Sequence, residues 1–99
     1  MHHTEHLRGL TPHACLHARR LLAVHRNLVV TSGLRSPERN RAVGGVPGSF
    51  HLKGRAIDVV GSRALLEAAA ATARAQRVTA QCTGPEEVVM EEDHLHLAW

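Results

Sequence analysis

Two short segments of the chain combine histidine with aspartate at spacings that could hold a metal ion. In the first, residues 49–58, His51 falls in an expected loop and Asp58 in the middle of an apolar strand. A carboxylate within an apolar strand costs free energy unless something pairs with it. A metal ion would satisfy Asp58, and a turn at Gly54 would bring His51 back as a second ligand. A surface histidine and an aspartate bonded to backbone amides are the alternative, and this segment leaves both open.

The second segment is Asp93-His94-Leu95-His96. The alternation of a strand places its two imidazoles on one face. A set of two histidines and one aspartate suits zinc and leaves a fourth position for water, which is typical of a catalytic site. A carboxylate nearby can take a proton from that water as it attacks a carbonyl. Asp93 and Glu92 are candidates for this base. Strand alternation would point Asp93 away from His94 and His96, so Asp93 can serve only if it lies in the bend that enters the strand.

The remaining histidines fall into an N-terminal group and a helical group, and we expect both to be solvated. His13 and His17 have the i, i+4 spacing of a helical metal pair, but the sequence suggests no third ligand beside them. The two groups are His2, His3 and His6, and His13, His17 and His25.

Three helices are expected around these segments. A hydroxyl followed by proline, at Thr11-Pro12 and again at Ser36-Pro37, is a typical helix start. Apolar residues recur on one face of the first helix to about Arg26, and Gly44-Gly45 closes the second. The third is alanine-rich. The expected helices therefore cover about residues 11–26, 36–45 and 62–76.

The strands are expected from short β-branched or alternating runs, with residues 46–53 as a loop. On the strand that carries Asp58, Ala56 and Val60 share its face and Ile57 and Val59 take the other. Helices followed by a small, mostly antiparallel sheet predict an α+β domain with helices packed on the sheet. The expected strands are residues 28–31, 56–60, 78–83, 87–91 and 94–99, with a turn at Gly84-Pro85.

Ninety-nine residues allow a single domain, residues 1–99, and 43% hydrophobic with 21% charged residues is a globular composition. With 2% aromatic residues, the core must be built from leucine, valine, isoleucine and alanine. A small core of this kind would gain stability from a bound metal. We expect residues 1–9 to be flexible.

The formal net charge of +3 is spread along the chain, and few aromatic side chains are available to stack on bases. We therefore expect no nucleic-acid partner. No apolar run approaches the roughly 20 residues of a membrane span, so membrane insertion is not expected, and the first ten residues lack the apolar core of a signal peptide. Cys15 and Cys82 are 67 positions apart, and free buried thiols are expected, with a disulfide between them as the alternative.

Three motifs in register resemble the zinc D-Ala-D-Ala carboxypeptidases and related peptidoglycan peptidases of family M15, which include phage endolysins. They are the SGxRSPxxN segment within residues 31–40, the SxHxxGxAxD segment at 49–58 and the DHxH segment at 93–96, with Ala-Val-Gly-Gly at 42–45 after the first. The resemblance covers two thirds of the chain and implies the small α+β fold shared by Hedgehog proteins and D-Ala-D-Ala peptidases.

The resemblance also implies roles for single residues. His51, Asp58 and His96 would bind one Zn²⁺ per chain. Asp93 would act as general base, and His94 would help to bind or stabilise the tetrahedral intermediate.

Substrate binding is assigned by the same resemblance to Arg35, which would hold a carbonyl or carboxylate, and to Ser49 and Phe50. A guanidinium suits this role because it offers a fork of donors and stays charged as an oxyanion develops. Leu34 and Phe50 depart from the family pattern, where an aromatic and a polar residue are more usual, and both changes would reshape the substrate groove.

The expected function is therefore a zinc metallopeptidase that hydrolyses amide bonds in peptidoglycan stem peptides, as a D-Ala-D-Ala carboxypeptidase or an endolysin-type endopeptidase. The alternative is a non-catalytic zinc-binding module of the same fold. The expected partner is a peptidoglycan peptide, and the protein is expected to be a monomer. It would be made in the cytoplasm and act on the cell wall, during phage lysis or by delivery with a phage tail.

Overall fold

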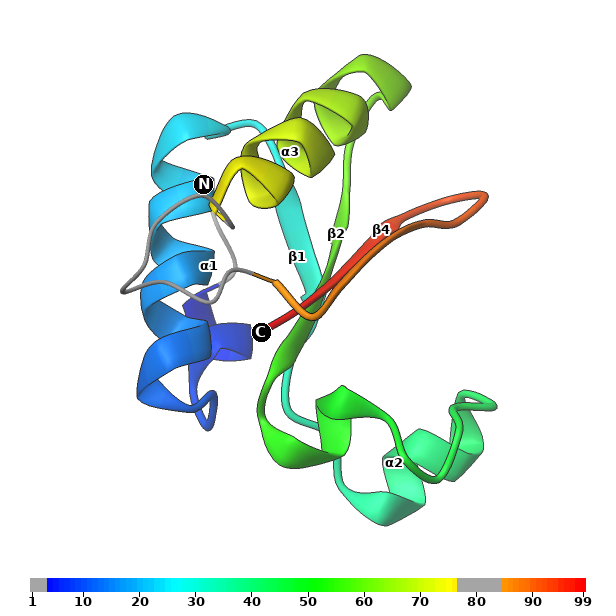
Figure 1. Cartoon of the computed structure of the whole chain (residues 1–99). Helices are drawn as coiled ribbons and strands as arrows, with labels where there is room; N and C mark the ends of the chain where they lie inside the picture. Colours follow the sequence, from blue (N-terminus) through cyan, green and yellow to red (C-terminus); the bar gives the residue numbers. More distant parts are fainter. Residues whose placement is uncertain (1–3, 77–84) are drawn as a thin grey trace.

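The structure, a computed structural model, describes residues 4–76 and 85–99 and confirms the α+β class. Its antiparallel sheet has the order β1-β2-β4-β3, which places β2 and β4 at the centre (Figure 1). The strands are β1 Val29–Ser32, β2 Ala56–Val60, β3 Glu87–Met90 and β4 Leu95–Ala98. The helices are α1 Pro12–Val24, α2 Pro37–Ala42 and α3 Arg63–Ala75, and the 3-10 turns are η1 Thr4–Leu7 and η2 Phe50–Lys53.

The three expected helix starts are confirmed, and each has the same physical basis. The hydroxyl of the residue before the helix accepts a hydrogen bond from a backbone N–H of the first turn. The capping residues are Thr11, Ser36 and Ser62, with donor–acceptor distances of 3.3, 3.1 and 3.2 Å. In the described part of the chain, no helix is long and apolar enough to cross a membrane.

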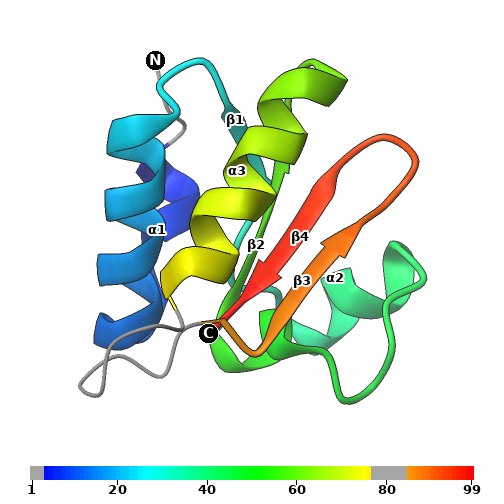
Figure 2. The ribbon, with the colours of Figure 1, turned by 45° about the horizontal axis from the view of Figure 1, so that its top comes forward.

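The two long helices, α1 and α3, cover one face of the sheet, whereas α2 and η2 lie beyond one end of it (Figure 2). Alternate residues of the central strands point toward α1 and α3: Ile57 and Val59 from β2, and Leu95 and Leu97 from β4, all fully buried. The core is built mainly from leucine, valine, isoleucine and alanine, as the composition predicts. The opposite face of β2 and β4 carries Asp58 and His96, next to the small residues Ala56 and Ala98.

One expectation differs from the structure in detail. Residues 50–53 of the expected loop form η2, because the Ser49 hydroxyl caps the His51 N–H and Gly54, at a φ of 66°, ends the turn in the left-handed region. Near the N-terminus, η1 places Leu7 in the core.

Some expectations fall outside the described residues. They are the strand at 78–83, Gly84 of the expected turn, His2, His3 and Cys82. Cys15 is a free cysteine, as expected.

The prediction that His17 is solvated is wrong. Its ring is 3% exposed and stacks on Trp99, with ring centroids 6.0 Å apart and planes 8° apart. Trp99 itself is buried, and its indole N–H donates to Gln76 Oε1 at 2.9 Å. Burial lowers the pKa of His17, and the charges of His13 and Arg20 lower it further.

We predict that this buried imidazole makes the fold sensitive to acid. Because the folded-state pKa of His17 lies below its ordinary 6.5, its contribution is fully present above that pH and is lost as the pH falls through the folded-state value. His17→Phe keeps a flat ring against Trp99 and removes the titration. The melting temperature of the variant, relative to the native protein, should therefore be higher at pH 5 than at pH 7.5. An unchanged difference between the two pH values would contradict the prediction.

Candidate metal centre

The register of the sheet brings Asp58 and His96 together on the face away from the long helices. Asp58 lies directly opposite His96 on β4, and His96 lies opposite Val89 on β3. On the other side of β2, Asp58 lies opposite Ser32. The pairing of β1 with β2 shifts between Val30 and Ser32, and this bulge turns Ser32 toward the site although Val30 is buried in the core.

His51 reaches the same place from η2. Its Nδ1 bonds to the Gly33 carbonyl oxygen at 2.8 Å, so this nitrogen carries the proton. In the neutral ring, Nε2 then presents a lone pair toward Asp58 Oδ1, 3.2 Å away. The left-handed conformation of Gly54 returns the chain from η2 into β2, and a Cβ there would lie 2.4 Å from the Gly9 carbonyl oxygen. Glycine at this position therefore sets the path that aims His51 at Asp58.

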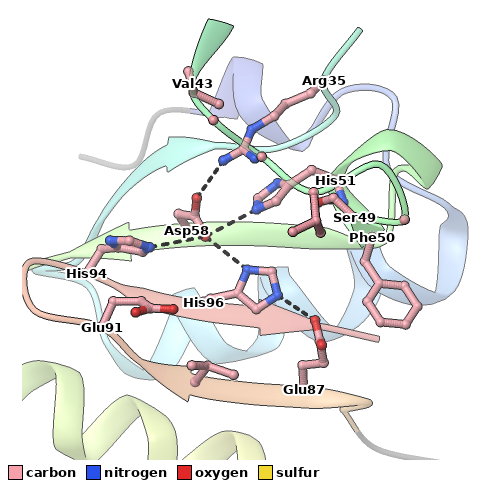
Figure 3. A pocket seen from close by; sticks show the side chains of 15 residues that line it. Arg35, Val43, Ser49, Phe50, His51, Asp58, Glu87, Glu91, His94 and His96 are labelled. Carbon is pink, nitrogen blue, oxygen red and sulfur yellow. Dashed lines mark hydrogen bonds and ion pairs between the residues drawn. The ribbon is translucent and has the colours of Figure 1, made fainter. Parts of the chain in front are cut away.

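His96 is oriented in a corresponding way by Glu87. Nε2 of His96 donates to Glu87 Oε1 at 2.8 Å, and Nδ1 faces Asp58 Oδ1 at 3.2 Å (Figure 3). Because a carboxylate at Nε2 favours the proton on that nitrogen, the lone pair of the neutral ring lies on Nδ1. Two imidazole lone pairs thus converge on one carboxylate oxygen.

These three donors fit a divalent metal ion. Nitrogen or oxygen atoms of His51, Asp58 and His96 all lie within 4.8 Å of one another, and in the described residues they form the group that could hold a metal. Tetrahedral zinc with bonds of about 2.0–2.1 Å separates its ligand atoms by about 3.3 Å, close to the 3.2 Å that joins each histidine to Asp58. Facing lone pairs repel one another unless a proton or a cation lies between them, so the donor set is suited to a bound cation.

The carboxylate of Asp58 is held in its charged form. Burial raises its pKa, but in the absence of a metal the protonated histidines around it outweigh burial, through hydrogen bonds from His51 and His96 and the charges of His51 and His94, and bring the pKa well below its usual range. Its second oxygen, Oδ2, accepts from Arg35 Nη2 at 3.0 Å. Because Oδ2 is bound to Arg35, Asp58 has one oxygen, Oδ1, with which to coordinate a metal ion.

Arg35 lies beside the site, as expected, and is fixed by further contacts. Its Nε donates to Ser32 Oγ at 3.1 Å and its Nη1 to Asn40 Oδ1 at 3.4 Å. Asn40 is buried and in turn donates to the Val46 carbonyl oxygen at 2.8 Å. Three of the five N–H donors of the guanidinium are thus engaged, and two are left for a ligand.

The expected pair Asp93 and His94 lies at the edge of the cluster. Asp93 Oδ1 accepts from His94 Nδ1 at 2.6 Å, and His94 Nε2 points inward, 3.9 Å from Asp58 Oδ1. The Asp93 side chain is 87% exposed, and its hydrogen bond from His94 lowers its pKa. His94 therefore faces the site, and Asp93 contacts it from outside.

The cluster forms the floor of an open cavity of about 580 Å³. Of the expected site residues, Asp93 and the alternative base Glu92 do not line it, whereas the others do: Arg35, Ser49, Phe50, His51, Asp58, His94 and His96. The Phe50 ring lies under the cationic groups of Arg55 and Lys53, at 4.8 and 5.5 Å. The cavity therefore brings together residues from η2, β2, β3 and β4 and from the loops that follow β1 and α2.

Glu87 is the site residue that the sequence did not indicate. It lies two residues from Val89, the cross-strand neighbour of His96, so its contact depends on a strand register that sequence spacing does not specify. Strand alternation is the sequence feature that could have pointed to Glu87. In the expected strand 87–91, one face carries Glu87, Val89 and Glu91. All three line the cavity.

The helical histidines contribute nothing to this centre. His25 Nε2 lies 2.7 Å from the Thr72 hydroxyl, where it joins the end of α1 to α3. His13 packs edge-on against His17, with ring centroids 4.5 Å apart.

We predict that Glu87→Gln weakens binding of Zn²⁺ about tenfold, because the charged acceptor that orients His96 and makes it more basic is lost. Glu86→Gln is the matched control, since Glu86 pairs with Arg55 and does not contact His96. Competition with a chromogenic chelator measures both affinities. Equal affinities in the two variants would show that Glu87 has no influence on the metal site.

We also predict that protons compete with the metal. The hydrogen bond to Asp58 raises the pKa of His96, burial opposes this, and Glu87 raises it further. A proton on His96 must leave before a metal binds, so affinity for Zn²⁺ should fall as the pH drops from 8 to 6. Calorimetric titrations in buffers of different ionisation enthalpy would detect the released proton. An affinity that does not change over this range would contradict the expectation.

Comparison with known proteins agrees with this geometry. No curated protein and no solved structure matches the chain. The family model described as Peptidase M15 matches residues 12–98, which include the cluster and every element of the sheet. The histidine and aspartate donors fit the zinc chemistry of that family. The chain belongs to the peptidase M15 family.

Proposed function

We propose that the protein is a zinc metallopeptidase that hydrolyses amide bonds in the stem peptides of peptidoglycan. The observation that carries the proposal is the set of three protein donors at the floor of an open cavity, with Arg35 bound to the outer oxygen of the aspartate donor. Three donors leave a coordination position free, as catalytic zinc sites require. Membership of the M15 family supports a hydrolytic reaction.

His51, Asp58 and His96 would hold the ion. When bound, zinc supplies a Lewis acid and lowers the pKa of water from its bulk value toward neutrality. Arg35 has two N–H donors to offer an amide oxygen at the cavity wall, where they would stabilise negative charge that develops on it.

The proton taken from the attacking water would go to the Asp93–His94 pair. His94 Nδ1 donates to Asp93, so the lone pair of the neutral ring is on Nε2, the nitrogen that faces the cavity. His94 Nε2 can accept a proton at this position, and the Asp93 carboxylate stabilises the imidazolium that results. In this proposal Asp93 acts as a base through His94.

Substrate would lie between the β3 wall and the loop that carries Ser49 and Phe50. Exposed apolar side chains, Val43, Val46 and Val89, border the cavity and suit the methyl groups of alanine residues. The proposed place of action is the cell wall, reached during phage lysis or with a phage tail. The proposed partner is the peptide alone, bound by a monomer.

A non-catalytic zinc-binding module is the second candidate. The observation that favours it is the position of Asp93, which is exposed and does not line the cavity.

The proposal can be tested on purified peptidoglycan. The zinc-loaded protein is incubated with it, and the soluble products are analysed by mass spectrometry. We predict that Asp93→Asn and His94→Gln keep their zinc and lose at least about 100-fold in rate, because a general base contributes that much. Asp58→Ala should lose zinc, rate and melting temperature together. If only Glu92→Gln lowers the rate of hydrolysis, the general base would be assigned to Glu92 instead. If the zinc-loaded native protein releases no fragment, the non-catalytic module is the better description.

A further inference from the structure

A second cavity lies on the other side of Arg35 from the metal centre. Its volume is about 290 Å³, half that of the main cavity, and Arg35, Val43 and Asp58 line both. Arg39 of α2 and His6 of η1 also line it. A ligand that occupies both cavities would therefore extend past Arg35 while part of it remains at the metal centre.

The charge of this cavity is positive. Asp58 is the acid that lines it, and both oxygens of Asp58 are already engaged, Oδ1 by the histidines and Oδ2 by Arg35. Arg39 is exposed, and its guanidinium makes no ion pair or hydrogen bond with residues 4–76 or 85–99. One guanidinium in the cavity wall is thus left without a counter-ion.

The size and the rim of the cavity limit what can bind. A volume of about 290 Å³ accommodates one side chain or terminal group, not a folded partner. Leu34 and Val43, both about half exposed, border the arginines with apolar surface. A carboxylate on a short methylene stem matches this combination of guanidinium and apolar contacts.

We propose that Arg39, together with Arg35, forms a subsite for a carboxylate carried by the same peptide whose amide bond lies at the metal centre. This inference rests on the proposed function, because the metal centre must hold the rest of the peptide. It makes Arg39 a specificity-determining residue: peptides with an acidic group next to the scissile bond would be preferred over their neutral amides.

The helix that carries Arg39 also provides a control. Arg41 is exposed on α2 as well, but it lines a different cavity, beside Pro37 and Asn40. Arg39→Gln and Arg41→Gln remove the same charge from the same helix. A difference in affinity between the two variants would therefore result from the position of Arg39 in the cavity and not from the net charge of the protein.

Binding can be measured separately from catalysis, by amide NMR shifts of the zinc-loaded protein. The probes are acetyl-L-alanyl-D-glutamate and its neutral diamide, acetyl-L-alanyl-D-glutamine amide, with sodium sulfate as a free anion. We expect the acidic probe to shift residues 31–39 and to bind the native protein and Arg41→Gln about tenfold more tightly than Arg39→Gln, which is the scale of one charge-assisted contact. The diamide should bind all three proteins equally weakly.

Equal affinity of Arg39→Gln and the native protein for the acidic probe would overturn the subsite, because the carboxylate would then lie on the metal or on Arg35 alone. Sulfate that binds as tightly as the acidic probe, with the same dependence on Arg39, would overturn the peptide assignment in favour of a free-anion site. Lack of peptidoglycan hydrolysis would refute the proposed function and leave these binding differences unchanged, so the two failures are distinguishable.

Discussion

The buried carboxylate of Asp58 is the constraint around which this small domain is organised. It lies in the central strand of the sheet, 7% exposed, where an unpaired charge would strongly destabilise the fold. Its neighbours in the sequence, Ile57 and Val59, are fixed in the core, so the strand cannot turn Asp58 to solvent without exposing both. The surrounding chain must therefore supply its partners.

The four partners of Asp58 come from three different parts of the chain, and each is oriented by a further contact. The Gly33 carbonyl orients His51, Glu87 orients His96, Asp93 orients His94, and Ser32 and Asn40 orient Arg35. In a partly buried site, such outer contacts decide which nitrogen carries a proton and where each lone pair points. Along β2, alternate residues lie in the core and at the site. Binding of a cation at the site is therefore coupled to the stability of the domain.

The features predicted best from the sequence are those that depend on residues close together in the chain. A capping hydroxyl and a proline mark the start of α1 and α2 whatever the tertiary structure, and the strand 56–60 was predicted with its observed bounds. His51 and Asp58, two of the expected metal ligands, lie together because the motif spacing retains the path of η2 into β2, and His96 joins them from the neighbouring strand β4. The contacts made by Glu87, and the stacking of His17 on Trp99, depend on elements that meet only in the folded chain. Spacing along the sequence does not contain that information.

The three histidines around Asp58 differ in their inner distance and in the exposure of their outer partner. His51, His94 and His96 each give one ring nitrogen to an acceptor and turn the other toward Asp58 Oδ1. For His51 and His96 that inner distance is 3.2 Å, the spacing of two ligands on one metal ion, whereas for His94 it is 3.9 Å. The acceptor of His94 is the more exposed one, since the Asp93 side chain is 87% exposed and that of Glu87 is 42% exposed, so a proton on the His94 ring would have a route outward through Asp93. A metal ligand must be held in position, whereas a group that exchanges protons needs contact with water. In the proposed function, Glu87 on β3 would supply the first condition and Asp93, in the bend before β4, the second.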